Sequence, residues 1–148
     1  MRNRWTKTYV DGLGRTVKEE KGYGSSPGVT ESVVETQYVP CACSPFGKVK
    51  RVSRIRMPGQ PVVWTDYVYD WAGRTTEVRH APVSGNGAAG SQGTNTYFYA
   101  VEASPDEGNA MRSTVRITDP AGRWKKQWTD GFGNLVKVTE PKPGGGEY

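Results

Sequence analysis

The chain has 148 residues, a net charge of +5 and a hydrophobic fraction of 34%, which suits a single domain over 1–148 without a large apolar core. Its 19 Gly and 10 Pro leave no stretch long enough for a stable isolated helix, and none approaches the ~20 apolar residues of a membrane span. Lys and Arg stand mostly singly between apolar residues, a distribution typical of a solvated face that does not favour nucleic acid as a partner.

The predicted elements, in chain order, are β-strands joined by turns. Strands are expected at 5–10, 15–21, 31–39, 48–56, 61–69, 74–80, 94–102, 111–118, 123–129 and 135–140. Loops are expected at 22–28, 82–93 and 104–109, and a tail at 141–148, because Gly, Pro and small polar residues gather there. The segment 22–28 holds three Gly and one Pro, which predicts that it lies outside any strand ladder.

One turn element recurs along the chain: Asp, two further residues, Gly, and then Arg or Asn. Its copies carry the pairs Asp11 and Gly14, Asp70 and Gly73, Asp119 and Gly122, and Asp130 and Gly133, with a degenerate fifth copy at Ser44 and Gly47. Asp or Ser at the first position can hydrogen-bond the backbone two residues on, and Gly at the fourth tolerates a positive φ. The flanking segments are rich in Val, Thr, Tyr and Trp, so each copy predicts a β-hairpin.

Residues 111–118 show the clearest alternation. Met111, Ser113, Val115 and Ile117 share one face of the expected strand, and Arg112, Thr114, Arg116 and Thr118 share the other. This alternation is typical of a sheet with one wet side. Asp119 and Asp130 lie only eleven positions apart, so one strand serves two successive hairpins, and the sheet is expected to be a meander.

The hairpins resemble the YD (tyrosine-aspartate) repeats of the Rhs family, in which Tyr-Asp-x-x-Gly-Arg/Asn precedes an alternating strand. Tyr69-Asp70-Trp71-Ala72-Gly73-Arg74 is the best match; Tyr9 is shifted by one residue from Asp11, and Thr118 and Thr129 replace Tyr in the last two copies. The resemblance implies an all-β meander of hairpins that forms a curved or spiral antiparallel sheet. In the family such sheets build shells of large secreted bacterial proteins that enclose a toxic domain, and related animal cell-surface adhesion proteins.

The resemblance therefore implies a structural role, an extracellular or cell-surface location, and further YD repeats of the same or neighbouring chains as partners. Family shells need many more repeats, so closing a chamber would take a longer chain or several copies. The first residues lack the apolar run of a signal peptide, and the chain is interpreted as a segment of a longer exported protein or of an assembly.

Asp119-Pro120-Ala121-Gly122 resembles the Asp-Pro-x-Gly segment that takes part in self-cleavage of toxin-carrying relatives. Another ordinary repeat follows it here, and no effector domain does. The segment is therefore interpreted as a plain turn with Pro at its second position.

Catalytic chemistry is not expected. His80 is the single His and has no credible nucleophile with it. The four turn Asp residues recur at one equivalent position, whereas a catalytic acid and base need two different environments. No enzymatic activity and no cofactor are predicted.

Cys41 and Cys43 leave three alternatives open. They are either two small residues near a hairpin turn, or a disulfide (strained within the pair, or between chains), or part of a metal site. Only His80 could add a third ligand of the usual zinc type, so no metal site is predicted.

Trp124 and Trp128 share one face of strand 123–129 with Lys126, and Trp64, Tyr67 and Tyr69 lie on another strand. Such rows build cross-strand pairs in a sheet with few apolar residues, which is the interpretation preferred here. If exposed, Trp124 and Trp128 would stack on sugar rings, and the alternative function is a carbohydrate or surface-polymer binding module.

The expected edge strands, 2–10 and 135–140, carry no Pro that would protect them. They predict strand addition between copies or repeats, and a head-to-tail contact that does not close gives a filament. The sequence thus predicts a structural wall or scaffold segment of an extracellular bacterial assembly, either a toxin-enclosing shell or a self-assembled filament.

Overall fold

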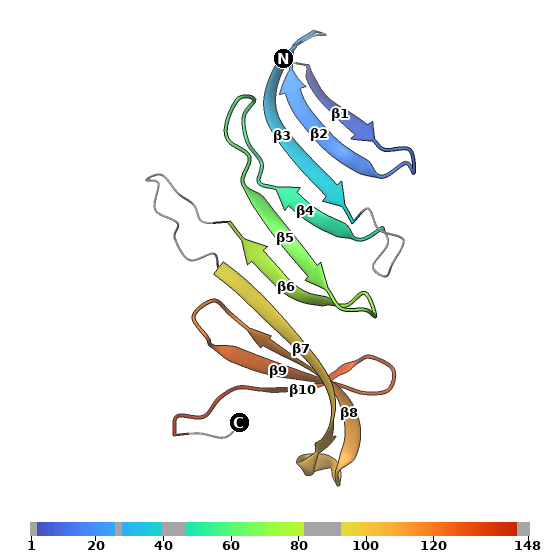
Figure 1. Cartoon of the computed structure of the whole chain (residues 1–148), viewed down its shortest axis with the longest axis vertical. Coiled ribbons are helices and arrows are strands. Elements are labelled where there is room, and N and C mark those ends of the chain that lie inside the picture. The colour runs from blue at the N-terminus through green and yellow to red at the C-terminus, as the bar shows by residue number, and fades with distance from the viewer. Residues whose placement is uncertain (1–2, 26–27, 40–46, 82–92, 145–148) are drawn as a thin grey trace.

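The computed structural model describes residues 3–25, 28–39, 47–81 and 93–144. Ten strands form one antiparallel sheet, in which every strand pairs with the next one along the chain (Figure 1). The strands are β1 (Arg4–Val10), β2 (Thr16–Tyr23), β3 (Val29–Tyr38), β4 (Val49–Ser53), β5 (Trp64–Tyr69), β6 (Thr75–His80), β7 (Gly93–Ser104), β8 (Ala110–Thr118), β9 (Trp124–Thr129) and β10 (Leu135–Thr139). The predicted all-β meander is confirmed.

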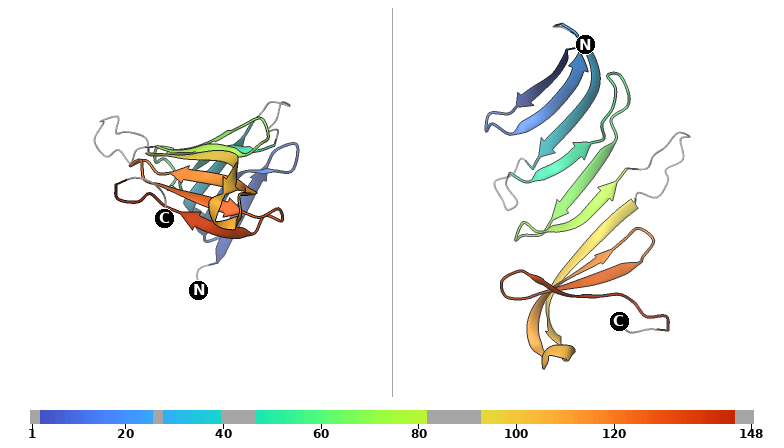
Figure 2. Two further views of the ribbon diagram at one scale, coloured as in Figure 1. Left: turned by 90° about the horizontal axis from the view of Figure 1, so that it is seen from below. Right: turned by 180° about the vertical axis from the view of Figure 1, so that it is seen from behind.

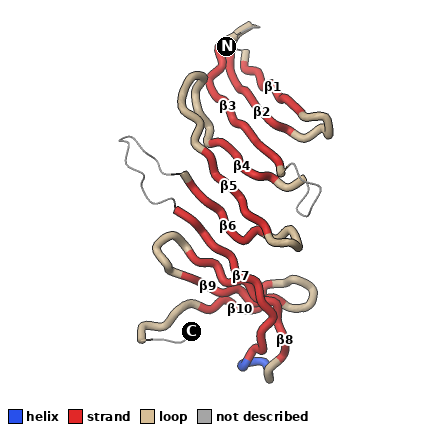
Figure 3. Tube along the Cα trace, viewed as in Figure 1, coloured by secondary structure: helices blue, strands red, loops and turns tan. Residues whose placement is uncertain are grey.

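The helical content of the described residues is one three-residue 3₁₀ turn, η1 (Pro105–Glu107), between β7 and β8 (Figure 3). Pro opens this turn and Gly108 ends it with a left-handed φ of 64°, a pattern that stops a helix after one turn. The strands therefore carry the fold.

The sheet is open and strongly twisted. β1 to β6 spread side by side in Figure 1, whereas β7 to β10 overlap one another in that view and run across the first strands in the view from below (Figure 2). The right-handed twist of each strand accumulates across a sheet, and bulges increase it locally. Register shifts occur in five of the ladders, including β1–β2 and β9–β10, so the curvature has a local cause.

Gly22 and Tyr23 correct the prediction of a loop over 22–28. Both belong to β2, where Gly22 pairs with Trp5 on one side and with Thr30 on the other. A Cβ on Gly22 would overlap the Val29 carbonyl oxygen and lie 2.5 Å from Cζ2 of Trp5. The missing side chain makes room for the indole ring, and this packing keeps a glycine inside the ladder.

Other strand ends differ from the expected ones by a few residues. β7 includes Gly93 and Ser104, which were predicted in loops, because its ladder with β8 continues to the pair of Ser104 and Ala110. β4 ends at Ser53 and β5 begins only at Trp64. Pro58 and Pro61 lie between them, and proline cannot donate a ladder hydrogen bond.

One face of the sheet holds all the buried strand side chains. By register, this covered face comprises Val33, Ser53, Ser104, Thr114, Trp128 and Thr139. Among the described residues, Val33 and Trp128 are the only buried hydrophobic side chains. The core is therefore thin, as the low apolar fraction predicts.

Long charged and aromatic side chains lie over the covered face in place of a second layer. The Arg51 guanidinium lies 4.4 Å from the Trp64 ring centroid, and Lys126 Nζ lies 2.9 Å from Glu102. Lys and Arg can cover apolar surface with their stems while their charged ends stay near water or a partner. Side chains of the sheet's own strands therefore shield the covered face from water.

The opposite face, called the open face here, carries the apolar residues of β8. Met111 is 63% exposed, whereas Thr114, on the covered face, is 5% exposed. The predicted alternation of β8 is present, but in the first half of the strand the polar side is the more buried one, since Thr114 is buried whereas Met111 and Ser113 are exposed. The reason is tertiary: long side chains of neighbouring strands lie over Thr114, and no described segment covers Met111.

Candidate functional site

The recurrent Asp turn has the same hydrogen bonds in all four complete copies. In the first copy, Asp11 Oδ1 accepts hydrogen bonds from the Leu13 and Arg15 N–H groups at 2.9 and 3.0 Å, and Oδ2 accepts one from Arg15 Nε at 2.8 Å. The Gly14 N–H donates to the Asp11 carbonyl at 3.0 Å, and Gly14 has a φ of 75°. One carboxylate thus holds three donors, which makes the turn rigid.

The same contacts recur around Asp70, Asp119 and Asp130, where Oδ1 accepts its two backbone hydrogen bonds at 2.9–3.0 Å. Asn134 replaces Arg in the last copy and donates from Nδ2 to Asp130 at 3.0 Å. In the degenerate copy Gly47 has a φ of 79°, while Ser44 lies outside the described residues. The carboxylates serve backbone geometry at every complete copy.

These hydrogen bonds keep the carboxylates ionised. Hydrogen bonding to the Arg15 side chain holds the pKa of Asp11 below its usual value, against a smaller opposing effect of burial. At Asp70 burial alone would raise the pKa, but hydrogen bonds from the Arg74 backbone and side chain outweigh it and lower the pKa. Asp119 and Asp130 have lowered pKa values through the side chains of Arg123 and Asn134. A carboxylate with a low pKa and filled lone pairs is a poor proton acceptor.

Three tyrosines of the open face join successive hairpins. Their hydroxyl groups donate to backbone carbonyls of the preceding strand: Tyr38 to Thr16 at 3.0 Å, Tyr69 to Val49 at 2.7 Å and Tyr99 to Thr75 at 2.9 Å. Each carbonyl belongs to the second residue after the turn glycine. We call these contacts the tyrosine links. Burial raises the pKa of Tyr69 and Tyr99.

In the hairpins of β1 to β6, the basic residue after the turn glycine makes a second connection between the same neighbours. The Arg15 guanidinium lies 4.3 Å from the centroid of the Tyr38 ring, and Arg74 lies 4.6 Å from that of Tyr99. In the middle copy, Lys48 Cε lies 3.6 Å from where a Cβ of Gly73 would be. Arg15, Lys48 and Arg74 therefore each lie against the next hairpin along the chain.

The two edges of the sheet are β1 and β10, as predicted, and each pairs with a single strand. The Asn3 carbonyl accepts from the Gly24 N–H, which makes Asn3 and Gly24 a hydrogen-bonded pair. Antiparallel ladders alternate, so the backbone N–H and C=O groups of Thr6 and Thr8 point away from β2. Edge groups of this kind are a template for another strand.

Trp124 and Trp128 lie on the same face, as expected, but they do not form an exposed platform. Trp128 is 4% exposed, and its Nε1 donates to Thr139 Oγ1 at 3.4 Å. Arg116 lies over the half-buried Trp124 ring, 4.5 Å from its centroid. The rings belong to the packing of β8, β9 and β10, which leaves little surface for a sugar to stack on.

The remaining candidates form no catalytic or metal constellation among the described residues. His80 ends β6, with its ring nitrogens 3.5 Å from Thr65 Oγ1 and 3.4 Å from Asn95 Nδ2. Within this part of the chain no three His, Cys, Asp or Glu residues gather to hold a metal ion. Cys41 and Cys43 lie outside the described residues, so their alternatives stay predictions.

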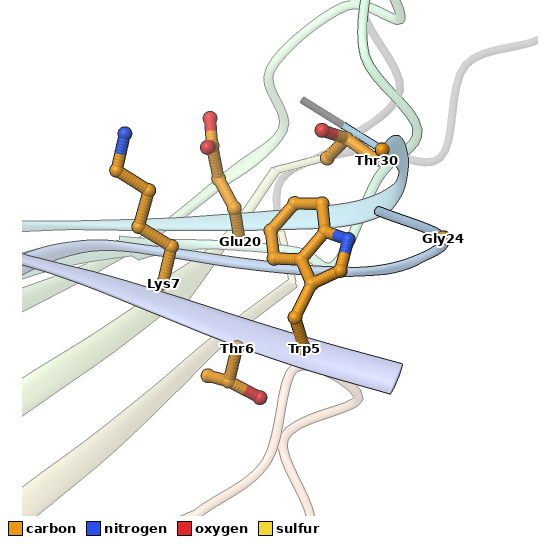
Figure 4. Close-up of a pocket in the computed structure, with 7 residues that line it drawn as sticks. Trp5, Thr6, Lys7, Glu20, Gly24 and Thr30 are labelled. Carbon is orange, nitrogen blue, oxygen red and sulfur yellow. The ribbon is translucent and has the colours of Figure 1, made fainter. Parts of the chain in front are cut away.

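A half-open depression of about 390 Å³ lies at the outermost hairpin, where Trp5, Lys7 and Glu20 rise from the same side of the sheet (Figure 4). Glu20 is engaged there by Lys18 at 2.6 Å and by the Tyr9 hydroxyl at 3.0 Å. The Lys18 side chain is the main reason that the pKa of Glu20 is lowered. Glu20, the carboxylate that lines this depression, is therefore already engaged.

Sequence reasoning missed two sets of residues. The tyrosine links recur at about 30-residue intervals in Tyr38, Tyr69 and Tyr99, a spacing that could have identified them. It also missed the exposed turn tips Leu13, Trp71 and Phe132. Their signal is a large apolar residue inside a turn that needs only Asp and Gly.

The chain matches no family model, no curated protein and no solved structure. In the described part of the chain, no helix has the length and apolar character needed to cross a membrane.

Proposed function

We infer that the chain is a structural segment: a wall or scaffold of β-hairpins within a larger extracellular bacterial assembly, either a toxin-enclosing shell or a filament of copies. The observation that carries this proposal is the single-layer sheet, whose hairpins are joined by repeated contacts and whose two edge strands have open backbone groups. The YD-repeat resemblance of the turns supports the extracellular and bacterial setting.

The strand count favours head-to-tail growth. With ten strands in strict antiparallel order, β1 of a second copy placed beside β10 continues the alternation in the same orientation. Such a contact uses two different edges, so it is heterologous and extends without closing unless the curvature brings the ends together. The same geometry applies when further repeats of one longer chain take the place of copies.

The proposal assigns no catalytic role. The turn carboxylates are filled with hydrogen bonds, and the conspicuous charged groups of the covered face pair with one another, as Lys126 does with Glu102 and Arg56 with Glu35 at 3.0 Å. These features support a structural role that depends on backbone pairing along the whole sheet and not on one site.

The test is the assembly state of the whole chain over a concentration series, measured by light scattering and negative-stain imaging. We expect open-ended particles that lengthen with concentration. Thr8→Pro removes an outward N–H of β1 without removing a β1–β2 hydrogen bond, so it should shift the population toward monomers, while Thr8→Val keeps the N–H and should assemble. A strictly monomeric, compact particle at every concentration would exclude assembly of copies.

A further inference from the structure

Three hairpin turns carry a large apolar side chain at the tip with very little protein contact. Leu13, Trp71 and Phe132 are 65%, 84% and 94% exposed. The turn hydrogen bonds use the Asp side chain, the Gly backbone and backbone N–H groups, so the tip side chains take no part in them. We call these three residues the tip rim.

The Asp119 turn serves as an internal control. It has the same backbone and carboxylate hydrogen bonds, including Arg123 Nε to Asp119 at 2.7 Å, but its tip residues are Pro120 and Ala121. It joins β8 to β9, at the opposite ends of the strands from the other three turns. The same turn chemistry thus carries apolar tips at one side of the sheet and small ones at the other.

The three turns of the tip rim reach one side of the molecule. The β1–β2, β5–β6 and β9–β10 turns all lie at the right-hand side in Figure 1 and at the left-hand side when the molecule is seen from behind in Figure 2. Four strand positions separate each turn from the next, which corresponds to about 19 Å at the usual strand spacing. The tips are therefore isolated apolar points and not a continuous patch.

A flat, soft partner suits this spacing better than a protein does. A stable protein interface needs a contiguous patch of about 800 Å² on each partner, whereas a bilayer interface accepts single apolar side chains and favours Trp and Phe there. Beneath two of the tips, Asp11–Arg15 and Asp70–Arg74 are ion pairs at 2.6 and 2.7 Å, so these tips bring little net charge to the headgroups. The net charge of +5 attracts anionic lipid.

We propose that the tip rim anchors the chain to the surface of a phospholipid bilayer that contains anionic lipid, with Leu13, Trp71 and Phe132 inserted between the headgroups. The sheet then stands on the membrane by one row of turns, and its edges stay open for neighbouring strands. This inference does not depend on the proposed assembly, because a single copy already carries all three tips.

The test is flotation of the whole chain with vesicles of phosphatidylcholine alone and of equal parts phosphatidylcholine and phosphatidylserine. Binding to the anionic vesicles is expected, with a partition coefficient that falls roughly tenfold for Trp71→Ala and again for Phe132→Ala, as expected for partial burial of an aromatic ring. The combined variant L13A/W71A/F132A should show almost no binding.

The matched control is V101A/M111A/V138A, which removes three exposed apolar side chains of the strands and leaves the tip rim intact. It should bind as the unchanged chain does. With brominated lipids, Trp71→Phe should keep binding but lose most of the tryptophan quenching, which reports insertion of the tip itself.

Equal vesicle binding by the two triple variants would overturn the proposal. Absence of binding of the unsubstituted chain to either vesicle type would also overturn it. A tip variant that loses self-association in light scattering, while no vesicle binding is seen, would do the same, because the tips would then contact protein.

Discussion

The first six strands and the last four hold the same kind of sheet together in different ways. Each of the three hairpins of β1 to β6 reaches the strand that follows it, β7 included, through a tyrosine link and through the basic residue after its turn glycine. In β7 to β10, the ladder between β7 and β8 extends over nine residue pairs, and packing gathers around Trp128, with Lys126 and Lys137 at 5.1 and 5.8 Å from its ring.

This single-layer sheet thus has two sources of stability. Hydrogen bonds to carbonyls near strand ends, repeated at each hairpin, contribute small amounts at many places. One buried indole contributes a large amount at one place. We therefore expect stability to be distributed in the first region and concentrated in the second.

The largest expected effect is that of Trp128→Ala. Removal of a buried indole that packs β9 and β10 should lower the free energy of unfolding by about 3–5 kcal/mol, measured by urea denaturation. Trp71→Ala removes the same side chain from an exposed tip and should change stability by less than about 0.5 kcal/mol. Similar losses for both variants would contradict the concentration of packing at Trp128.

The next effect concerns the packing of Trp5 in the first region. Gly22→Ala forces a methyl group against the Trp5 ring and the Val29 carbonyl and should destabilise the chain by about 1–3 kcal/mol. Gly131→Ala, where a Cβ would meet open space, is the control. If Gly22→Ala unfolds at the same urea concentration as the control, the close approach of Trp5 is not a feature of the molecule.

A smaller loss is expected from one tyrosine link. Tyr69→Phe leaves the ring but removes the hydrogen bond to Val49, at a cost of about 0.5–1.5 kcal/mol, with faster amide hydrogen exchange in β4 and β5. The pKa of Tyr69 is raised by burial, so this contribution is present below the usual tyrosine pKa and is lost as the pH rises through the folded value.

Tyr97→Phe is the control for that link, since within the described part of the chain its hydroxyl makes no hydrogen bond. Equal exchange rates in β4 and β5 for the two variants would show that the link does not hold the hairpins together.

The smallest effect is the acid dependence of the turns. The pKa of Asp11 is lowered below the ordinary 3.8, first by the Arg15 side chain, so its contribution to stability is complete above the unfolded pKa and is lost as the pH falls through the folded one. Asp11→Asn should flatten the fall in stability below about pH 4, measured as urea midpoints between neutral and acid pH. An unchanged acid slope would show that the turn carboxylate is not coupled to folding.

Much of the fold was predictable because its signals are local. Asp11 and Gly14, three residues apart, satisfy their own backbone within the turn, so each copy reverses the chain wherever it stands. The meander also followed from the short spacing of Asp119 and Asp130. The strand at Gly22 could not be predicted from its neighbours in sequence, because the Trp5 ring that completes it comes from another strand.

What the amino-acid sequence determined by itself is where the chain reverses and which residues alternate along each strand, since hydrogen bonds of a few residues' range decide both. Tertiary structure alone decided which face is covered. Thr114 is buried because register places Glu102 and Trp128 of the neighbouring strands beside it, whereas Met111 stays exposed on the opposite face. The side on which the three apolar turn tips lie follows from the strand order of the meander, because successive turns of an antiparallel sheet lie at alternate ends of the strands.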